Sequence, residues 1–269
     1  MNARILLCWN RGLGDIPLGV YAVVHRIFHW IPQAEITILT RPDLAEGFEL
    51  LKNVKVRVDP EGKRGSLVPL RTDFSSFDLV IQDPDPTQWC RWQLGKLQPK
   101  LQWKSEWDQL SSSFILDPQY IYLGAHVQTQ THYSYEKNWP LSRWKDLFKA
   151  LPSNYRVLLF GFPSQEEFSS EGLIDLRGKT SLIEMLSLIK NGCKYLVVPD
   201  SGILSMVYYI EAEYPLELIS LWADPHQGVL KQNVASANTQ LVHHPLVAPN
   251  RDLSALQVSA VLEKLRVYA

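Results

Sequence analysis

The stretch that decides the fold reads IDLRGKTSLIEMLSLIKNGCKYLVVPDSGILSM and spans residues 174–206. Apolar residues recur at helical spacing over 182–189, and Asn191-Gly192 supplies a stop signal for that helix. Residues 195–198 form a short apolar run between turn signals, which predicts a buried parallel strand. A second apolar helix follows Gly202. This order of helix, strand and helix indicates an α/β fold.

The turn after this predicted strand is Pro199-Asp200-Ser201-Gly202. Open α/β sheets bind ligands at the carboxyl ends of their strands. A turn that starts a helix offers backbone N–H groups, a hydroxyl and the positive end of the helix dipole, which together suit a phosphate. Asp200, Ser201 and Gly202 are therefore candidate diphosphate-binding residues. An ordinary capped helix start is the alternative explanation.

The composition is that of a globular protein, with 46% hydrophobic and 20% charged residues among 269. This length suits one large domain or two of roughly 120 to 150 residues. The formal net charge of -1 argues against a broad nucleic-acid surface. We therefore expect small molecules as ligands and no nucleic-acid partner.

The cysteines and the apolar runs bear on location. Cys8, Cys90 and Cys193 lie far apart and have neither metal-binding nor redox-active spacing, which predicts reduced thiols. No apolar run approaches the roughly 18 residues that a membrane helix needs. The first run, 5–9, also ends too early for a signal peptide. We therefore expect a cytoplasmic protein.

Strand and helix patterns alternate along the whole chain. Apolar strands are predicted at 5–9, 35–39, 54–58 and 77–83 in the first half, and at 120–127, 156–160, 195–198 and 218–222 in the second. Between the halves, Ser111-Ser112-Ser113 and Asp117-Pro118 indicate a linker. Helical spacing over 252–265 predicts a closing amphipathic helix. We therefore expect domains at 1–116 and 117–250, with the closing helix within 251–269.

The turn Asn10-Arg11-Gly12-Leu13-Gly14-Asp15 follows the first predicted strand. Its glycines let a substrate approach the backbone, and a carboxylate beside them is well placed to accept a proton. Asp15 is thus a candidate general base, with helix capping as the alternative role. The turn also resembles a dinucleotide fingerprint, but it lacks the third glycine, and the second strand ends at Thr40-Arg41 without an acidic residue.

A second carboxylate, Asp83, ends the strand predicted at 77–83, because Pro84-Asp85-Pro86 prevents a helix from following directly. Asp83 joins Arg11, Gly12 and Gly14 as a candidate acceptor-binding residue. The tryptophans that follow, interleaved with lysine and arginine, can stack on sugar rings or cover the edge of the first sheet. They are Trp89, Trp92, Trp103 and Trp107.

Lys137 precedes Asn138-Trp139-Pro140, after the carboxyl end of the strand predicted at 120–127. A lysine in this place can reach a diphosphate; an ordinary surface lysine is the alternative.

The histidines give a weaker signal. His25 and His29 lie on one predicted helix without a third ligand, so we expect no metal site. His126 and His132 lie near the expected ligand edge, where they can touch a ligand, be satisfied internally or face solvent.

Four stretches in fixed order resemble the heptosyltransferase family of glycosyltransferases. They are the turn 11–15, Lys137-Asn138-Trp139-Pro140, the run 175–182 and the run 198–202. The resemblance covers about the first 30 residues and about 120–225. It implies the GT-B fold, in which two Rossmann-like domains with parallel sheets face a central cleft.

The resemblance also implies an activity. Members transfer a sugar, typically from an ADP-linked heptose, to a lipopolysaccharide core with inversion at the anomeric carbon. On this basis Asp15 is the base, and Lys137 and Asp200-Ser201-Gly202 hold the donor diphosphate. A family position that often holds the ribose falls at Gln165, with Glu166 adjacent. The nucleotide sugar is then a substrate, and neither a cofactor nor a metal is required.

Two departures from the family pattern bear on function. The family usually has histidine where this chain has Ser205, and a serine cannot supply charge to phosphates. The first half of the chain, which holds the acceptor in this family, is also shorter than in most members. We expect an inverting, metal-independent enzyme that uses a lipid-linked or oligosaccharide acceptor of the envelope, in peripheral contact with the cytoplasmic face of the inner membrane. The alternative is a catalytically reduced homologue that binds a nucleotide or glycan.

Overall fold

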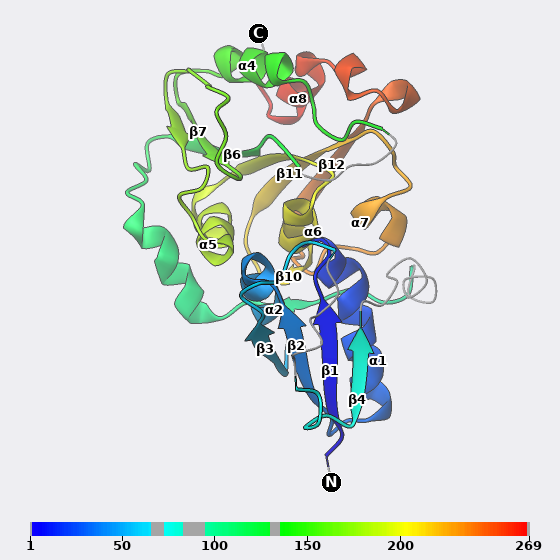
Figure 1. The fold of residues 1–269 in the computed structure, drawn as a ribbon. Coiled ribbons are helices and arrows are strands. Elements are labelled where there is room, and N and C mark those ends of the chain that lie inside the picture. The colour runs from blue at the N-terminus through cyan, green and yellow to red at the C-terminus, as the bar shows by residue number, and fades with distance from the viewer. Residues whose placement is uncertain (1, 66–72, 83–94, 130–134, 268–269) are drawn as a thin grey trace. The chain divides into compact units, whose positions relative to one another are not determined.

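The computed structural model describes residues 2–65, 73–82, 95–129 and 135–267, and the chain forms two compact units (Figure 1). Unit 1 comprises Met1–Trp103, Ser205–Ala212 and Gly228–Ala237, and unit 2 comprises Lys104–Leu204, Glu213–Gln227 and Asn238–Ala269. From the sequence we expect a boundary after residue 116. The units instead divide after Trp103, and unit 1 also takes two segments from the second half of the chain.

Unit 1 contains a parallel sheet with the strand order β3-β2-β1-β4. Its strands are β1 (Arg4–Trp9), β2 (Glu35–Thr40), β3 (Val54–Val58) and β4 (Leu79–Gln82), each within or beside a run predicted as a strand. The central strand β1 is buried from Ile5 to Trp9, as expected of a parallel strand covered on both faces. The hydroxyl of Thr40 donates a hydrogen bond to the carbonyl of Trp9 at 2.7 Å, which joins the carboxyl ends of β2 and β1.

Helices and a small second sheet complete unit 1. The π-helix η1 (Ile16–Val20) runs into α1 (Tyr21–Trp30), and the 3₁₀ turn η2 (Pro42–Leu44) runs into α2 (Ala45–Glu49). Strand β5 (Leu101–Gln102) pairs in parallel with β10 (Ile210–Glu211). Lys52 and Lys100 both form ion pairs with Glu211, at 2.6 and 3.1 Å. These contacts explain why residues after Leu204 return to unit 1.

Unit 2 contains a larger parallel sheet with the strand order β12-β11-β9-β6-β7-β8. Its strands are β6 (Ile121–His126), β7 (Tyr155–Phe160), β8 (Leu173–Asp175), β9 (Tyr195–Pro199), β11 (Leu216–Trp222) and β12 (Leu241–Val247). Every residue of β9 is buried, which confirms the strand predicted from the apolar run at 195–198. The helices of the second half are α4 (Leu141–Ala150), α5 (Leu182–Gly192), α6 (Gly202–Tyr209), α7 (Gly228–Gln232) and α8 (Val258–Lys264), of which α7 and most of α6 belong to unit 1.

Local hydrogen bonds explain why α5 begins at Leu182. The hydroxyl of Ser181 accepts a hydrogen bond from the backbone N–H of Glu184, and the Glu184 carboxylate accepts one from the N–H of Ser181 at 2.7 Å. This reciprocal capping satisfies N–H groups that have no partner within the helix. The helix ends at Gly192, as its Asn-Gly stop signal predicts.

Three expectations about the second half are wrong. The strand predicted at 218–222 is not the last, because β12 follows it; polar His243 and His244 and the strand-breaking Pro245 hide β12 from a search for apolar runs. A proline is tolerated there because β12 is an edge strand. The closing helix is also shorter than predicted, since α8 begins only at Val258 and the extended backbone at Leu256 separates it from a 3₁₀ turn capped by Asp252.

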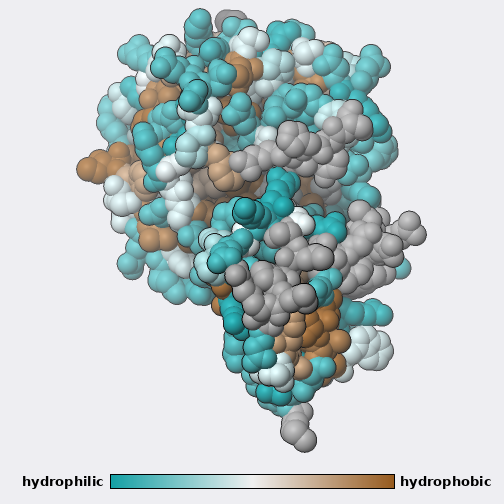
Figure 2. Space-filling view, viewed as in Figure 1, coloured by the Kyte–Doolittle hydropathy of each residue, from teal (hydrophilic) through white to brown (hydrophobic). Residues whose placement is uncertain are grey.

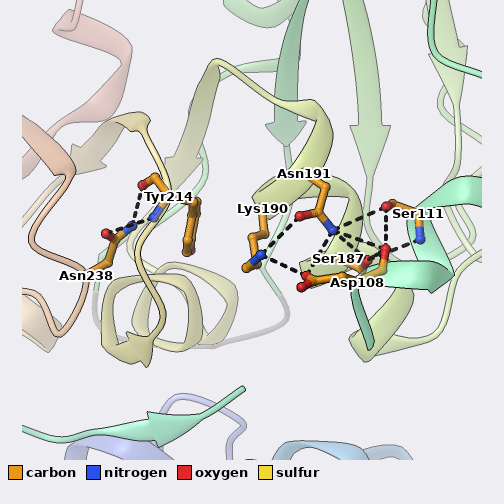
Figure 3. A network of polar contacts seen from close by, with 7 residues as sticks. All are labelled: Asp108, Ser111, Ser187, Lys190, Asn191, Tyr214 and Asn238. Carbon is orange, nitrogen blue, oxygen red and sulfur yellow. Dashed lines mark hydrogen bonds and ion pairs between the residues drawn. The ribbon is translucent and has the colours of Figure 1, made fainter. Parts of the chain in front are cut away.

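The third correction concerns the expected linker, because Ser111-Ser112-Ser113 ends a 3₁₀ helix, η3 (Ser105–Ser113), in unit 2. Each of these serine hydroxyls donates to a carbonyl three residues earlier in the same helix. Figure 3 shows the polar contacts that attach η3 to α5. Asp108 accepts hydrogen bonds from Lys190 at 2.8 Å and from the Asn191 amide at 3.2 Å.

The outer surface of unit 2 is mainly hydrophilic on the face shown in Figure 2, whereas hydrophobic side chains gather over β4 in unit 1. Leu79 of β4, an edge strand, is 49% exposed. Within the described residues, no helix combines the length and the apolar character needed to cross a bilayer.

The contacts of Asp108 generate a prediction about stability. We expect Asp108→Ala to lower the free energy of unfolding by about 1 kcal/mol, because the exchange removes the hydrogen bonds from Lys190 and Asn191 while leaving part of the site in water. Urea denaturation measures the effect. Asp146→Ala, on the exposed part of α4, is the matched control and is expected to change stability little. Equal effects from the two substitutions would contradict a specific attachment of η3.

Candidate functional site

The candidate site in unit 2 lies along the carboxyl ends of four adjacent parallel strands. Their order, β9-β6-β7-β8, places the residues that follow them on one edge of the sheet. His126 of β6 pairs in register with Phe160 of β7, and the carbonyl of Gly161 accepts a hydrogen bond from the N–H of Gly178 at 2.8 Å. Asp200 follows β9 directly. This is the edge at which open α/β sheets bind ligands.

Lys137 and Asp200 form a close, buried ion pair at this edge. Nζ of Lys137 lies 2.5 Å from Oδ2 of Asp200, and the two side chains are only 7% and 10% exposed. The interpretation of Lys137 as an ordinary surface lysine is therefore wrong. A cation in this buried position can meet an anionic ligand without first being stripped of bulk water.

The residues after Lys137 explain why it points inward. The Asn138 side chain accepts a hydrogen bond from the N–H of Thr129 at 2.6 Å and donates to the carbonyl of the same residue. The buried Trp139 indole donates to the carbonyl of Leu256 at 3.0 Å and packs edge-on against Trp144 of α4. Pro140 then occupies the N-cap position of α4, and its carbonyl accepts hydrogen bonds from the N–H groups of Arg143 and Trp144. These contacts fix the loop on both sides of the lysine.

Burial raises the pKa of Asp200 above its usual range; the neighbouring Lys137 opposes this shift and the carboxylate of Asp224 adds to it. Asp224, after β11, accepts a hydrogen bond from the N–H of His226 and pairs with Arg251 at 3.2 Å. The backbone N–H of His226 is the main cause of the lowered pKa of Asp224. Asp200 thus depends on Lys137 to keep its charge.

Ser201 and Gly202 lie where the sequence places them, at the start of α6. The hydroxyl of Ser201 accepts a hydrogen bond from the N–H of Leu204 at 3.3 Å, so Ser201 caps the helix. The capping role is confirmed, and phosphate binding by the same turn remains a prediction.

Gln165 and Glu166 lie in the loop after β7, and both are exposed. The N–H of Glu166 donates to the Ser164 hydroxyl at 3.2 Å, and its carbonyl accepts a hydrogen bond from Arg177 at 2.7 Å. The loop is thereby attached to the residues that follow β8. Contact of Gln165 or Glu166 with a ribose remains a prediction.

Arg177 lies in the run 175–182, where the sequence alone indicates no role for its side chain. Its side chain is 7% exposed and forms a bidentate pair with Asp175, at 3.0 and 2.7 Å. The guanidinium also lies over the ring of Phe168, 5.3 Å from its centroid. The pair lowers the pKa of Asp175. These contacts hold the Arg177 side chain beside the carboxyl end of β7.

His126 is buried at the end of β6, and burial lowers the pKa of its imidazole to about 4. The sequence left open whether this histidine faces solvent; the structure excludes that arrangement. His132, the other histidine named with it, lies outside the described residues.

In unit 1, Asp15 lies at the carboxyl end of β1, immediately before η1. Its Oδ2 accepts a hydrogen bond from the N–H of Gly12 at 3.0 Å. A side chain at Gly12 would place a carbon 3.0 Å from the same oxygen, so any other residue there would push against the Asp15 carboxylate. The carbonyl of Arg11 accepts a hydrogen bond from Arg41 at 3.1 Å. Arg41, directly after β2, thus holds the turn through this hydrogen bond. A catalytic role of Asp15 remains a prediction.

The remaining candidate acceptor residues are Gly14 and Asp83, and the structure describes only Gly14. Gly14 lies in the same turn as Gly12, and its carbonyl accepts a hydrogen bond from the N–H of Leu18 at 3.2 Å. Asp83 lies outside the described residues, as do Trp89 and Trp92.

Comparisons with known proteins support the resemblance. The profile of glycosyltransferase family 9 (heptosyltransferase) matches residues 90–206, which include Lys137 and Asp200. The heptosyltransferase resemblance is confirmed. No curated protein sequence matches this chain significantly.

Solved structures extend the likeness to the whole chain. The chain matches Escherichia coli ADP-heptose LPS heptosyltransferase II with 17% identity and a TM-score of 0.67, covering 98% of this chain and 97% of the other. It matches E. coli heptosyltransferase WaaC, solved with ADP-2-deoxy-2-fluoro heptose, with 14% identity and a TM-score of 0.57, covering 99% and 100%. The fold is therefore that of GT-B heptosyltransferases, as predicted.

A third relative is relevant to metals. TibC from enterotoxigenic E. coli, described as an iron-containing dodecameric glycosyltransferase, matches with 14% identity and a TM-score of 0.54. The match covers 94% of this chain and 66% of TibC.

The buried ion pair generates a prediction for a double-mutant cycle. We expect Lys137→Met to lower the free energy of unfolding by about 3 kcal/mol, because it leaves the Asp200 carboxylate buried without its cation. The double variant Lys137→Met/Asp200→Asn removes that charge and should recover most of the loss. Chemical denaturation measures all four proteins. A double variant as unstable as Lys137→Met would contradict a dominant role of the unpaired charge.

His126 generates a prediction about pH. Because its pKa is about 4 in the folded protein and about 6.5 when unfolded, the unfolded chain binds more protons between these values. This contribution to stability is present above pH 6.5 and is lost as the pH falls toward 4, on the order of 3 kcal/mol in all. Stability of His126→Phe should fall less over this range. Parallel pH profiles of the two proteins would show that His126 does not titrate in this way.

Proposed function

We propose that this protein is an inverting glycosyltransferase that moves a sugar from a nucleotide diphosphate, of the ADP-heptose kind, to a lipopolysaccharide or another envelope glycan. The observation that carries the proposal is the buried Lys137–Asp200 pair, at 2.5 Å, on the carboxyl edge of the unit 2 sheet. This pair lies within the residues that match the heptosyltransferase profile. WaaC, which shares the fold, was solved with an ADP-linked fluoro heptose.

The donor residues supply the leaving-group chemistry. Cleavage of the bond between the anomeric carbon and the phosphate oxygen places an electron pair, and hence negative charge, on the departing diphosphate. The Lys137 ammonium and the N–H groups at the start of α6 offset that charge. Asp200 holds Lys137 in place through their ion pair. Burial raises the pKa of Asp200, so its negative charge is stabilised mainly by the neighbouring Lys137.

Asp15 supplies the base in this scheme. Its carboxylate accepts the proton of the acceptor hydroxyl while the hydroxyl oxygen attacks the anomeric carbon from the face opposite the diphosphate, which inverts the configuration. The hydrogen bond from Gly12 keeps one carboxylate oxygen oriented. Arg11, Gly12, Gly14 and Asp83 are the proposed acceptor residues, and Gln165 and Glu166 the proposed ribose contacts.

A second candidate function is a catalytically reduced homologue that binds a nucleotide or glycan without turnover. Ser205 motivates it, because this residue of α6 is buried, and a hydroxyl cannot supply charge to a departing diphosphate. Nucleotide binding without transfer to any acceptor, across a broad panel of donors, would favour this function over the first.

Location and acceptor belong together in the proposal. A lipid-linked acceptor would be met by a cytoplasmic protein at the inner face of the membrane that carries it. Association with vesicles that contain the acceptor lipid, measured by flotation, tests this part separately.

The general base generates a prediction about activity. We expect Asp15→Asn to lower the rate of transfer by at least about 100-fold, because the amide cannot accept the acceptor's proton. Binding of ADP, GDP and UDP by calorimetry should match the unsubstituted protein. Asp78→Asn, an exposed carboxylate beside the amino end of β1, is the matched control. An active Asp15→Asn protein would remove this residue from the mechanism, and no binding of any of the three nucleotides would contradict the donor half of the proposal.

The absence of a metal requirement is a separate prediction. Lysine and helix N–H groups offset the diphosphate charge in the scheme above, so we expect transfer to continue at an unchanged rate in excess EDTA. The iron described in TibC makes this measurement informative. Loss of activity with EDTA, restored by a divalent cation or iron, would show that a metal takes part.

A further inference from the structure

The carboxyl ends of four adjacent strands in unit 2 carry a row of paired charges. In the strand order β12-β11-β9-β6, the charged residues that come after the strands are Arg251, Asp224, Asp200 and Lys137, respectively. The outer two are cations and the inner two are carboxylates. Lys137 pairs with Asp200 at 2.5 Å, and Arg251 pairs with Asp224 at 3.2 Å. A second ion pair therefore lies beside the Lys137–Asp200 pair.

The two ion pairs lie close enough to influence each other. β9 and β11 are neighbours in the sheet, so their ends are about 4.8 Å apart. Burial raises the pKa of Asp200, Lys137 opposes this shift, and the carboxylate of Asp224 adds to it. The pKa of Asp224 is lowered mainly by the N–H of His226 and to a smaller extent by Arg251. Because the two carboxylates repel each other, each is stabilised by a cation of its own.

The backbone after β12 brings Arg251 to this position. The N–H of Ala248 donates to the carbonyl of Trp222 at 2.8 Å, which holds the chain against the end of β11. In the short turn η4 (Pro249–Arg251), Asn250 and Arg251 have φ angles of 54° and 58°. Residues with side chains rarely adopt this left-handed backbone, which persists only where surrounding contacts compensate for the strain. Strained turns of this kind are concentrated at sites that bind ligands.

The guanidinium of Arg251 is more accessible than the ammonium of Lys137. The Arg251 side chain is 58% exposed, whereas that of Lys137 is 7% exposed. The described contacts of the guanidinium are the Asp224 carboxylate and the ring of Tyr135, whose centroid lies 5.8 Å away. A guanidinium has five N–H donors, so a carboxylate at one nitrogen leaves donors for another anion. Phosphate oxygens match the geometry of these donors.

The proposed reaction calls for more positive charge than Lys137 supplies. Lys137 and Asp200 together carry no net charge, and the hydroxyl of Ser205 on α6 adds none. When the bond between the anomeric carbon and the phosphate oxygen breaks, its electron pair stays on the diphosphate. The acceptor oxygen forms the new bond to the anomeric carbon, and its proton passes to Asp15. A second cation at the same edge stabilises the charge left on the diphosphate.

We propose that Arg251, paired with Asp224, is this second cation and binds the donor diphosphate. The inference rests on the proposed function, since it assumes a nucleotide diphosphate donor. Both residues lie outside 90–206, the stretch that matches the family profile, so that match does not imply their role. If Arg251 supplies charge that Ser205 cannot, the buried serine is no reason to expect a chain without transfer activity.

Calorimetric titration of the full chain tests the proposal with two probes, ADP and inorganic diphosphate. ADP is the leaving group of the proposed donor, so its affinity reports the charge that Arg251 offsets. We expect Arg251→Met to weaken the binding of both probes about tenfold, because a charge-assisted hydrogen bond is lost. Arg251→Lys keeps the positive charge without the planar fork and should recover part of the affinity for both probes.

Arg266→Met is the matched control. Arg266 also has a left-handed backbone, with a φ of 57°, and its side chain is 65% exposed and pairs with Glu217 at 3.1 Å. Glu217 lies near the amino end of β11, away from the edge at which the ligand is expected. Both affinities should therefore match those of the unsubstituted protein.

Each other outcome overturns the inference in a distinguishable way. Unchanged affinities in Arg251→Met overturn it and leave the proposed function intact. Equal losses in Arg266→Met overturn it by assigning the effect to general surface charge. Weaker ADP with unchanged inorganic diphosphate overturns it by placing Arg251 at the nucleoside. No binding of ADP, GDP or UDP by the unsubstituted protein overturns both this inference and the proposed donor. Thermal unfolding checks that every variant is folded, as expected for exposed side chains.

Discussion

The structure of the candidate site depends on one constraint, the burial of opposite charges at the edge of a sheet. Removing a lysine and an aspartate from water is costly, and only a close pair with well-placed neighbours offsets that cost. The Trp139 indole, the Asn138 amide and the cap of α4 together hold Lys137 against Asp200. A protein under no functional demand gains little from such an arrangement, because packed apolar residues of similar volume stabilise equally well or better.

Other strand ends of the unit 2 sheet also carry titratable groups. Three of the strand ends carry a titratable group whose surroundings set its charge: Asp200 with a raised pKa, Asp224 with a lowered pKa, and His126, which burial keeps uncharged near neutral pH. Parallel pairing is what collects these residues, since every strand of the sheet ends on the same side.

Much of this arrangement could be predicted from the sequence, where the pattern of residues was local. The apolar runs identified most long strands, and the Asn-Gly stop signal placed the end of α5. What could not be predicted depends on contacts between distant residues. β12 carries histidines and a proline that only its edge position accommodates, η3 is a serine-rich segment held by α5, and Lys137 resembles a surface lysine until Asp200 is seen beside it. Arg177 and His126 each have a buried side-chain nitrogen without a hydrogen-bond partner among the described residues, which the sequence does not reveal.

The edge strand β12 has a consequence for how the molecules behave in solution. A parallel sheet that ends in an uncovered strand can recruit a strand from another molecule and grow into an aggregate. Pro245 has no N–H to offer such a strand, and beside it His244 is held by Glu217, which also binds Arg266. Proline and charged side chains on an edge strand are among the means by which proteins discourage this growth. The same residues that concealed the strand in the sequence thus protect the protein from its own copies.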